Sequence, residues 1–133
     1  MKINQFEPFI GQDEYNAIQE CFDGKWITEG PKAKEFSEKL RDLIGVEYGV
    51  FAPNGTLAIY LALRSLNIGP GDEVIVPDFT FLASASAVEM VGATPVFCDI
   101  NKNDLQFNVS DCTRLLTKKT KAIMPVHIYG LSA

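Results

Sequence analysis

The sequence lacks the short motifs that most quickly assign a nucleotide or metal site. Neither the P-loop pattern GxxxxGK[ST] nor the dinucleotide pattern GxGxxG occurs, so the two common nucleotide-binding loops are excluded. Cys21, Cys98 and Cys112 have no CxxC spacing and only one histidine accompanies them, which indicates neither a disulfide framework nor a zinc site. Free cysteines of this kind suit a reducing, cytoplasmic location.

Concentrated positive charge and long apolar runs are also missing. The net charge is −5, and the one dense basic run, residues 118–121, is better explained as a solvated turn than as a nucleic-acid contact. The N-terminus has no apolar leader, and the most apolar stretch, residues 79–97, is interrupted by Glu89, Gly92 and Pro95. We therefore expect a cytoplasmic protein that binds neither nucleic acid nor membrane.

The sequence does contain an alternation of two periodicities. Helical spacing predicts two N-terminal helices, Gln12–Phe22 and a second that begins at Pro31 and ends at Gly45. From Tyr48 onward, short apolar runs alternate with helical stretches. The expected strands are Tyr48–Ala52, Glu73–Val76, Thr94–Cys98 and Ala122–Val126, and the expected helices between them are Leu57–Leu66, Leu82–Val91 and Asp111–Leu116.

Such alternation is typical of βαβ units, so the fold class is α/β, with a mostly parallel sheet flanked by helices. Residues 1–47 form the N-terminal helices of this scheme, and residues 48–133 form the first βα units of a larger domain. Ala122–Val126 has the character of a central strand, yet no helix follows it to cover the sheet. We therefore expect a domain truncated at its C-terminus, whose open edge and apolar faces would favour association or poor solubility.

The turn Pro53-Asn54-Gly55-Thr56 stands between an expected strand and an apolar helix. The first N–H groups of a helix are unpaired, and the positive end of the helix dipole lies behind them, so an anion fits there. Gly55 lets the backbone approach the anion, and the Thr56 hydroxyl adds a donor. We expect a single phosphate ester. The alternative is that Asn54 simply caps the helix.

Other candidates lie in loops. Phe81 follows the next strand at the ligand-binding edge of an α/β sheet, where its ring could stack on a planar ligand or instead fill the core. Trp26, Thr28 and Glu29 form a loop that suits a polar ligand with an apolar face, such as a sugar, although Trp26 could also pack back on the core. His127 follows the last strand, but a lone histidine receives no acid or base role.

Six segments together resemble one enzyme family. They are residues 24–31 (GKWITEGP), 54–58 (NGTLA), 69–77 (GPGDEVIVP), 80–81 (TF), 92–99 (GATPVFCD) and 125–130 (PVHIYG). In this order they closely resemble the DegT/DnrJ/EryC1/StrS nucleotide-sugar aminotransferases, which are fold-type I enzymes dependent on pyridoxal 5′-phosphate. The resemblance covers the chain from about Pro8 to Gly130.

The resemblance implies roles for the candidates. Gly55 and Thr56 would hold the cofactor phosphate, Phe81 would stack on the pyridine ring, and the loop of Trp26, Thr28 and Glu29 would lie near the sugar nucleotide. The substrate would be a nucleotide-linked 4-keto-6-deoxysugar, with perosamine-type amination as the leading expectation and glutamate as the amino donor. The family works as homodimers, so a homo-oligomer is expected.

The sequence also departs from the family. The aspartate that pairs with the pyridine nitrogen and the lysine that forms the Schiff base lie, in the family, beyond the point where this sequence stops, so we assign no catalytic residue here. We expect this stretch alone to be inactive. Two alternatives stay open: a non-catalytic truncated fragment, and part of a pyridoxal-phosphate-dependent sugar dehydratase of the same family.

Overall fold

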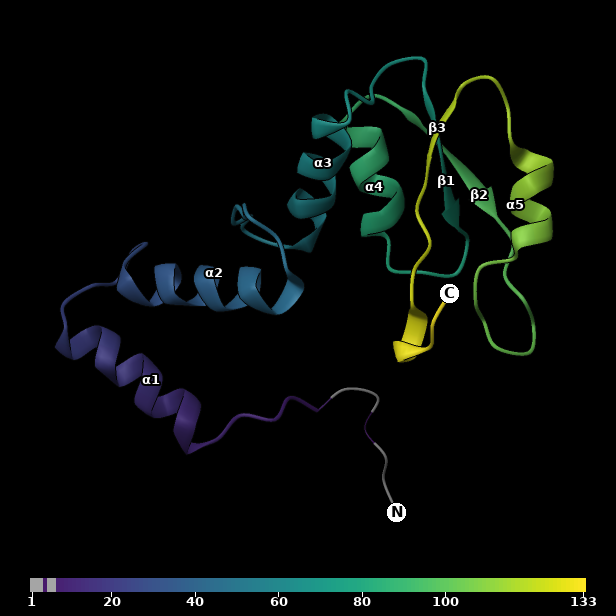
Figure 1. The fold of residues 1–133 in the computed structure, drawn as a ribbon. Coiled ribbons are helices and arrows are strands. Elements are labelled where there is room, and N and C mark those ends of the chain that lie inside the picture. The colour runs from purple at the N-terminus through teal and green to yellow at the C-terminus, as the bar shows by residue number, and fades with distance from the viewer. Residues whose placement is uncertain (1–3, 5–6) are drawn as a thin grey trace. The chain divides into compact units, whose positions relative to one another are not determined.

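The structure is a computed structural model that describes Asn4 and residues 7–133. The chain forms two compact units, Met1–Val50 and Phe51–Ala133, and each is described by itself. Figure 1 shows the elements in chain order, from the N-terminal helices to the βα units. Among the described helices, none is long and apolar enough to cross a membrane.

The first unit contains two helices, α1 (Gln12–Asp23) and α2 (Pro31–Ile44). Both predicted helices are therefore confirmed. Pro31 occupies the first turn of α2, where its missing N–H costs nothing, and Gly45 ends the helix with a φ of 76°, in the left-handed region that favours glycine. Neither helix contains a buried residue.

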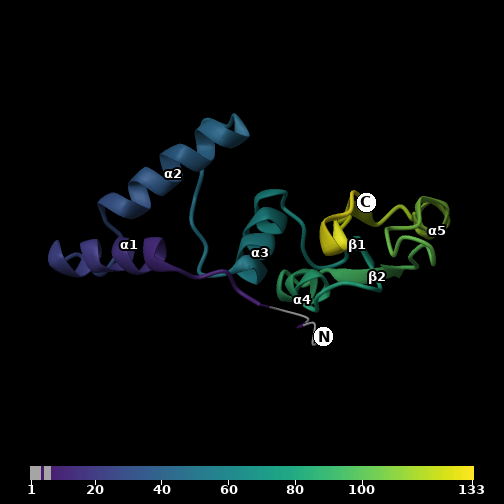
Figure 2. The same cartoon turned by 90° about the horizontal axis from the view of Figure 1, so that it is seen from below.

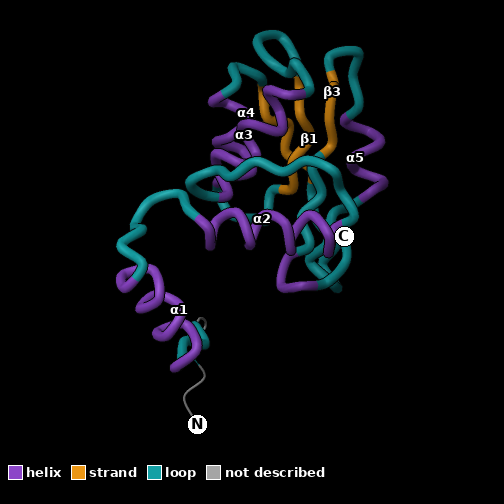
Figure 3. Tube along the Cα trace, turned by 60° about the vertical axis from the view of Figure 1, so that its left-hand side comes forward, coloured by secondary structure: helices purple, strands orange, loops and turns teal. Residues whose placement is uncertain are grey.

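The second unit alternates helices and strands. In chain order its elements are α3 (Gly55–Ser65), β1 (Glu73–Pro77), α4 (Ala83–Met90), β2 (Thr94–Cys98), α5 (Val109–Leu115), β3 (Thr120–Ile123) and the 3₁₀ turn η1 (Ile128–Gly130). The strands form a parallel sheet in the order β2-β1-β3. Figure 3 shows these strands in orange between the purple helices of the unit. The predicted α/β class with a parallel sheet is confirmed.

The central strand β1 is buried on both faces. Val74 and Val76 are fully buried in a cluster with α3 and α4 that includes Leu63 and Val88. Ile75 faces the other way and packs in a second cluster with Cys98, Phe107 and Cys112 on the α5 side. Successive residues of a strand point to opposite faces, so β1 contributes side chains to both clusters. Figure 2 shows α3 and α4 on one side of the sheet and α5 on the other.

Two strand predictions were wrong in whole or part. Tyr48–Ala52 is not a strand: it contains no assigned strand residue, and Tyr48 and Val50 are 79% and 87% exposed. A parallel strand exists only beside a partner, and no described strand pairs with this segment. The strand expected at Ala122–Val126 is instead β3, which ends at Ile123 and lies at an edge of the described sheet, not at its centre.

Candidate functional site

A cleft of about 610 Å³ lies at the edge of the sheet where β1 and β3 end. Three segments line it: the turn that opens α3, the loop from β1 into α4, and the chain that follows β3. Ligands of open parallel sheets bind at this carboxyl edge. The lining residues are Asn54, Gly55, Thr56, Ile59, Thr80, Phe81, Ala83, Ser84, Met124, Pro125, Val126 and His127.

The turn that opens α3 offers backbone donors to this cleft. Asn54 is the N-cap, and its side-chain oxygen accepts a hydrogen bond from Leu57 N–H at 3.0 Å. The Asn54 carbonyl accepts from Ala58 N–H at 3.0 Å. The N–H groups of Gly55 and Thr56, which come first in the helix, have no acceptor among the described residues and stay available. Asn54 therefore caps the helix and still leaves two donors for an anion.

The space beside Gly55 is open. A Cβ built on this glycine meets no atom of the protein within 4 Å, and its backbone is not in the left-handed region. A larger side chain would therefore fill part of the cleft without straining the fold. This is the space that an anion would need to reach the two N–H groups. No lysine or arginine is among the described residues that line the cleft, so any anion there depends on backbone donors and the helix dipole.

Phe81 and a pair of hydroxyl groups form the second wall. The Phe81 side chain is 77% exposed, which rules out the alternative of a core aromatic. Behind it, Thr80 Oγ1 lies 3.2 Å from Ser84 Oγ, and Ser84 is 4% exposed. Sequence reasoning missed Ser84; the available signal was a second hydroxyl one helical turn after Thr80.

The third wall carries His127. Its Nδ1 accepts a hydrogen bond from the backbone N–H of Ala133 at 2.8 Å. An imidazole nitrogen that accepts carries no hydrogen, so in the neutral ring the proton is on Nε2. His127 thus contributes a hydrogen-bond donor to the lining of the cleft.

The buried cysteines nearby are not nucleophiles. Burial, with a smaller contribution from Asp111, raises the pKa of the Cys98 thiol to about 11, and burial also raises the pKa of Cys112. A thiol with so high a pKa stays protonated at neutral pH. Both cysteines belong to the core on the α5 side of the sheet.

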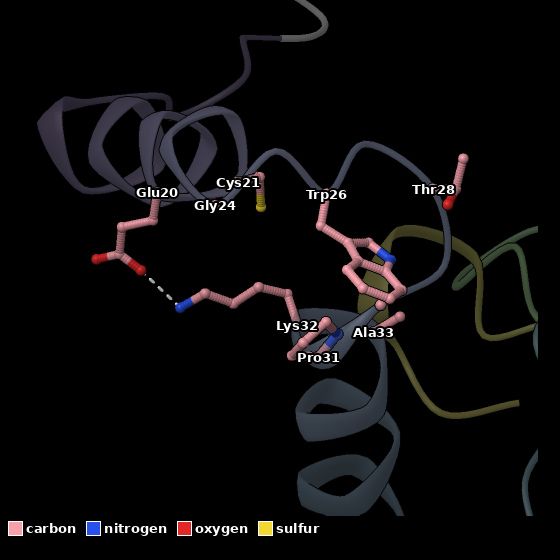
Figure 4. Close-up of a pocket in the computed structure, with 9 residues that line it drawn as sticks. Glu20, Cys21, Gly24, Trp26, Thr28, Pro31, Lys32 and Ala33 are labelled. Atoms are coloured by element: carbon pink, nitrogen blue, oxygen red, sulfur yellow. Dashed lines mark ion pairs between the residues drawn. The ribbon is translucent and has the colours of Figure 1, made fainter.

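The first unit contains a separate small cavity of about 200 Å³ (Figure 4). Trp26 and Thr28 line it, whereas Glu29 is not part of its lining. The Trp26 indole folds over its own loop: Nε1–H donates to Glu29 O at 2.7 Å, and a Cβ on Gly30 would collide with the ring. The indole is 54% exposed, so it packs on the loop and not in a core.

A cation and an anion frame the same cavity. Lys32 Nζ lies 2.7 Å from Glu20 Oε2, and this hydrogen-bonded ion pair raises the pKa of Lys32 (Figure 4). Both side chains are more than half exposed, so the pair contributes little to stability. Of the expected site residues, the structure thus brings Gly55, Thr56 and Phe81 into one cleft and places Trp26 and Thr28 at another cavity.

Comparison with known proteins identifies the family. Residues 8–133 match the model of the "DegT/DnrJ/EryC1/StrS aminotransferase family". The chain belongs to this family. This match confirms the family predicted from the six sequence segments. Enzymes of this family depend on pyridoxal 5′-phosphate, and solved relatives contain it or its amino form PMP.

Two curated relatives and one solved structure illustrate the similarity. GDP-perosamine synthase of Escherichia coli O157:H7 is 42% identical over 129 residues, which cover 96% of this chain and 35% of the relative. UDP-N-acetyl-3-dehydro-alpha-D-glucosamine 3-aminotransferase of Acidithiobacillus ferrooxidans is 49% identical over 116 residues, covering 87% of this chain and 31% of the relative. The structure of NtdA from Bacillus subtilis with bound cofactor PMP superposes with a TM-score of 0.81 at 34% identity, and the match covers 89% of this chain and 27% of NtdA. The chain therefore spans about a third of the length of its relatives.

Proposed function

We propose that the protein carrying this chain is an aminotransferase that uses pyridoxal 5′-phosphate to aminate a nucleotide-linked keto sugar. The observation that carries the proposal is the cradle at Gly55 and Thr56, two free N–H groups and a hydroxyl that face a cleft with room for a phosphate. The cofactor fits the residues present, because its phosphate is a single anion and its ring is planar. Family membership supports the same cofactor.

Each wall of the cleft has a role in this proposal. Gly55 and Thr56 hold the phosphate, as donors at the positive end of α3. Phe81, exposed at the cleft, would offer its ring as a stacking surface for the pyridine ring. When bound, the cofactor would supply an aldehyde carbon that accepts the amino group from the donor and an electron-withdrawing ring beside it. His127 donates a hydrogen bond to an oxygen of the ligand and does not act as a base, because Ala133 occupies its Nδ1.

The substrate class is also part of the proposal. The relatives include a GDP-perosamine synthase and an aminotransferase of a UDP-linked sugar, so the shared chemistry is amination of a sugar attached to a nucleotide. We propose glutamate as the donor, a homo-oligomer as the assembly, and Trp26, Thr28 and Glu29 as substrate contacts. The cavity beside Trp26 supports a role for this loop in binding a ring.

We propose further that this 133-residue chain by itself does not catalyse the transfer of the amino group. No lysine is among the described residues that line the cleft, and the reaction needs an amine there. Borohydride treatment in the presence of pyridoxal 5′-phosphate, followed by peptide mass spectrometry, checks this expectation. A single lysine of the chain reduced onto the cofactor in high yield would contradict it.

The affinity for pyridoxal 5′-phosphate tests the cradle. Gly55→Val places methyl groups in the open space of the cleft and should weaken binding at least tenfold, while Thr56→Ala removes one hydroxyl donor and should weaken it by about three- to tenfold. Thr113→Ala is the matched control: it removes the same atoms from α5, where the hydroxyl donates to Val109 O and to no other described residue. Unchanged affinity in both cradle variants would contradict the proposed function.

A further inference from the structure

Gln106 is a buried polar side chain outside the lining of the cleft. It lies in the loop between β2 and α5, and 5% of its surface is exposed. Its backbone is fixed on both sides: Gln106 O accepts from Asn101 N–H at 2.8 Å, and Gln106 N–H donates to Asp104 Oδ1 at 2.9 Å. The side chain therefore leaves the loop from a well-defined position.

The amide group of Gln106 contacts a segment 22 residues away. Nε2 donates to Asp104 O at 3.1 Å and to Ile128 O at 3.3 Å. Both partners are carbonyl oxygens, which accept only, so the nitrogen and not the oxygen of the amide faces them. Oε1 is buried and has no partner among the described residues. An unpaired buried oxygen destabilises a fold, so stability alone does not explain a glutamine here.

The contacted segment carries part of the cleft. Ile128 directly follows His127, whose ring lines the cleft. The Ile128 carbonyl also accepts from Leu131 N–H at 3.2 Å, so both of its lone pairs are used. Tyr129 has a φ of 54°, which is unusual for a residue other than glycine. Its ring packs near Phe79, with 6.3 Å between the two ring centroids. External contacts thus hold this strained turn in place.

We propose that Gln106 is a positioning residue: its amide holds the loop His127–Gly130 and so sets the place of His127 at the cleft. The inference rests on the proposed function, because the position of His127 matters to a ligand only if the cleft binds one. Gln106 itself touches no ligand in this account. It acts through the Ile128 carbonyl.

Hydrogen exchange and ligand affinity, measured together on the unchanged chain and on variants, test the proposal. Gln106→Met keeps the length of the side chain and removes both donors, and Gln106→Glu sets a carboxylate against two carbonyls. The matched control is Gln12→Met, because the Gln12 amide is exposed and, among the described residues, donates only to Asn16 Oδ1, at 2.8 Å. Peptides that cover residues 127–131 report on the loop, and peptides that cover β1 report on the whole unit.

We expect Gln106→Met to speed hydrogen exchange in residues 127–131 by about three- to tenfold. The affinity for pyridoxal 5′-phosphate should fall by a similar factor. Gln106→Glu should have the larger effect, and β1 should exchange as before. The imidazole ¹⁵N signals of the chain's one histidine should also move in both variants, since Ala133 N–H and the ring separate when the loop loosens.

Three results would overturn the proposal: unchanged exchange at residues 127–131, equally faster exchange in β1, or a looser loop with unchanged ligand affinity. Failure of the unchanged chain to bind pyridoxal 5′-phosphate is a different result. It would contradict the proposed function, and the loop exchange and the His127 signals would then decide on their own whether Gln106 holds the loop.

Discussion

The two units of the chain differ in how they are stabilised. The unit Phe51–Ala133 has its own interior: Val74, Ile75 and Val76 of β1 are fully buried. In the unit Met1–Val50, α1 and α2 also carry apolar residues at helical spacing, but neither helix contains a buried residue. Phe36 and Leu43 of α2, for example, are 55% and 83% exposed. An apolar stripe stabilises a helix only when something covers it. The comparison shows that amphipathic pattern predicts a helix, while burial decides its contribution to stability.

The largest expected effect comes from one substitution made in both units. Leu63→Ala removes a side chain of α3 that is 4% exposed and should lower the free energy of unfolding by about 3 kcal/mol. Leu43→Ala removes the same atoms from α2, where the side chain is 83% exposed, and should change it by less than about 0.5 kcal/mol. Urea unfolding of the 133-residue chain measures both. Similar losses would show that α2 is covered in solution.

A smaller effect is expected at the helix caps. Asn54→Ala removes the side-chain acceptor of Leu57 N–H and should cost about 1 kcal/mol. Asn54 also lines the cleft, so the stability and cofactor affinity of this variant should be compared with those of Asn108→Ala, which removes the equivalent cap of α5. We expect equal losses of stability in the two variants and weaker binding of pyridoxal 5′-phosphate only in Asn54→Ala. This result would show that a lost cap by itself does not weaken binding. Weakened binding in both variants would contradict that expectation.

Acid should weaken the second unit through Asp111. The Asp99 N–H, and after it Arg114, hold the pKa of Asp111 below its ordinary value of 3.8, so the fold favours the ionised carboxylate. This stabilisation is complete above the ordinary value and is lost as the pH falls through the lowered one. Asp111→Asn should therefore be less stable than the unchanged chain at neutral pH, and the difference should shrink in acid.

Arg114→Gln sharpens this prediction. Arg114 contacts Asp111 Oδ1 at 2.6 Å, but the larger cause of the lowered pKa is the backbone donor at 2.9 Å, which the variant keeps. Urea unfolding at several pH values should show a smaller loss of pH dependence than in Asp111→Asn. An equal loss would assign the effect to the arginine.

The smallest effect is expected at the start of α1. Gly11 is its N-cap and has no side chain to accept a hydrogen bond, while Glu14 Oε2 accepts from Gly11 N–H at 2.7 Å. Gly11→Asn should raise stability by only a few tenths of a kcal/mol, roughly the advantage of asparagine over glycine at this position. The gain should appear in the helicity measured by circular dichroism. A large gain would show that α1 contributes more to stability than its exposure indicates.

The sequence predicted best what local chemistry determines. Pro31 and Gly45 bound α2 as expected, and the strand Thr94–Cys98 matches β2. The run Tyr48–Ala52 failed because strand formation depends on a partner, which an apolar pattern cannot reveal. At the site, Gly55, Thr56 and Phe81 were predicted from their positions in the sequence, whereas Ser84 was missed although it lies only four residues after Thr80. Outside the cleft, Gln106 became visible only through its burial and its contact with a segment distant in sequence.

The central claim is that the first N–H groups of α3 bind the phosphate of pyridoxal 5′-phosphate. Amide ¹H–¹⁵N spectra of the isotope-labelled chain, titrated with the cofactor and separately with pyridoxal, test this directly. We expect the Gly55 and Thr56 signals to shift with pyridoxal 5′-phosphate and to stay in place with pyridoxal, which lacks the anion. Phosphate-dependent shifts confined to other residues, with Gly55 and Thr56 unmoved, would contradict the account.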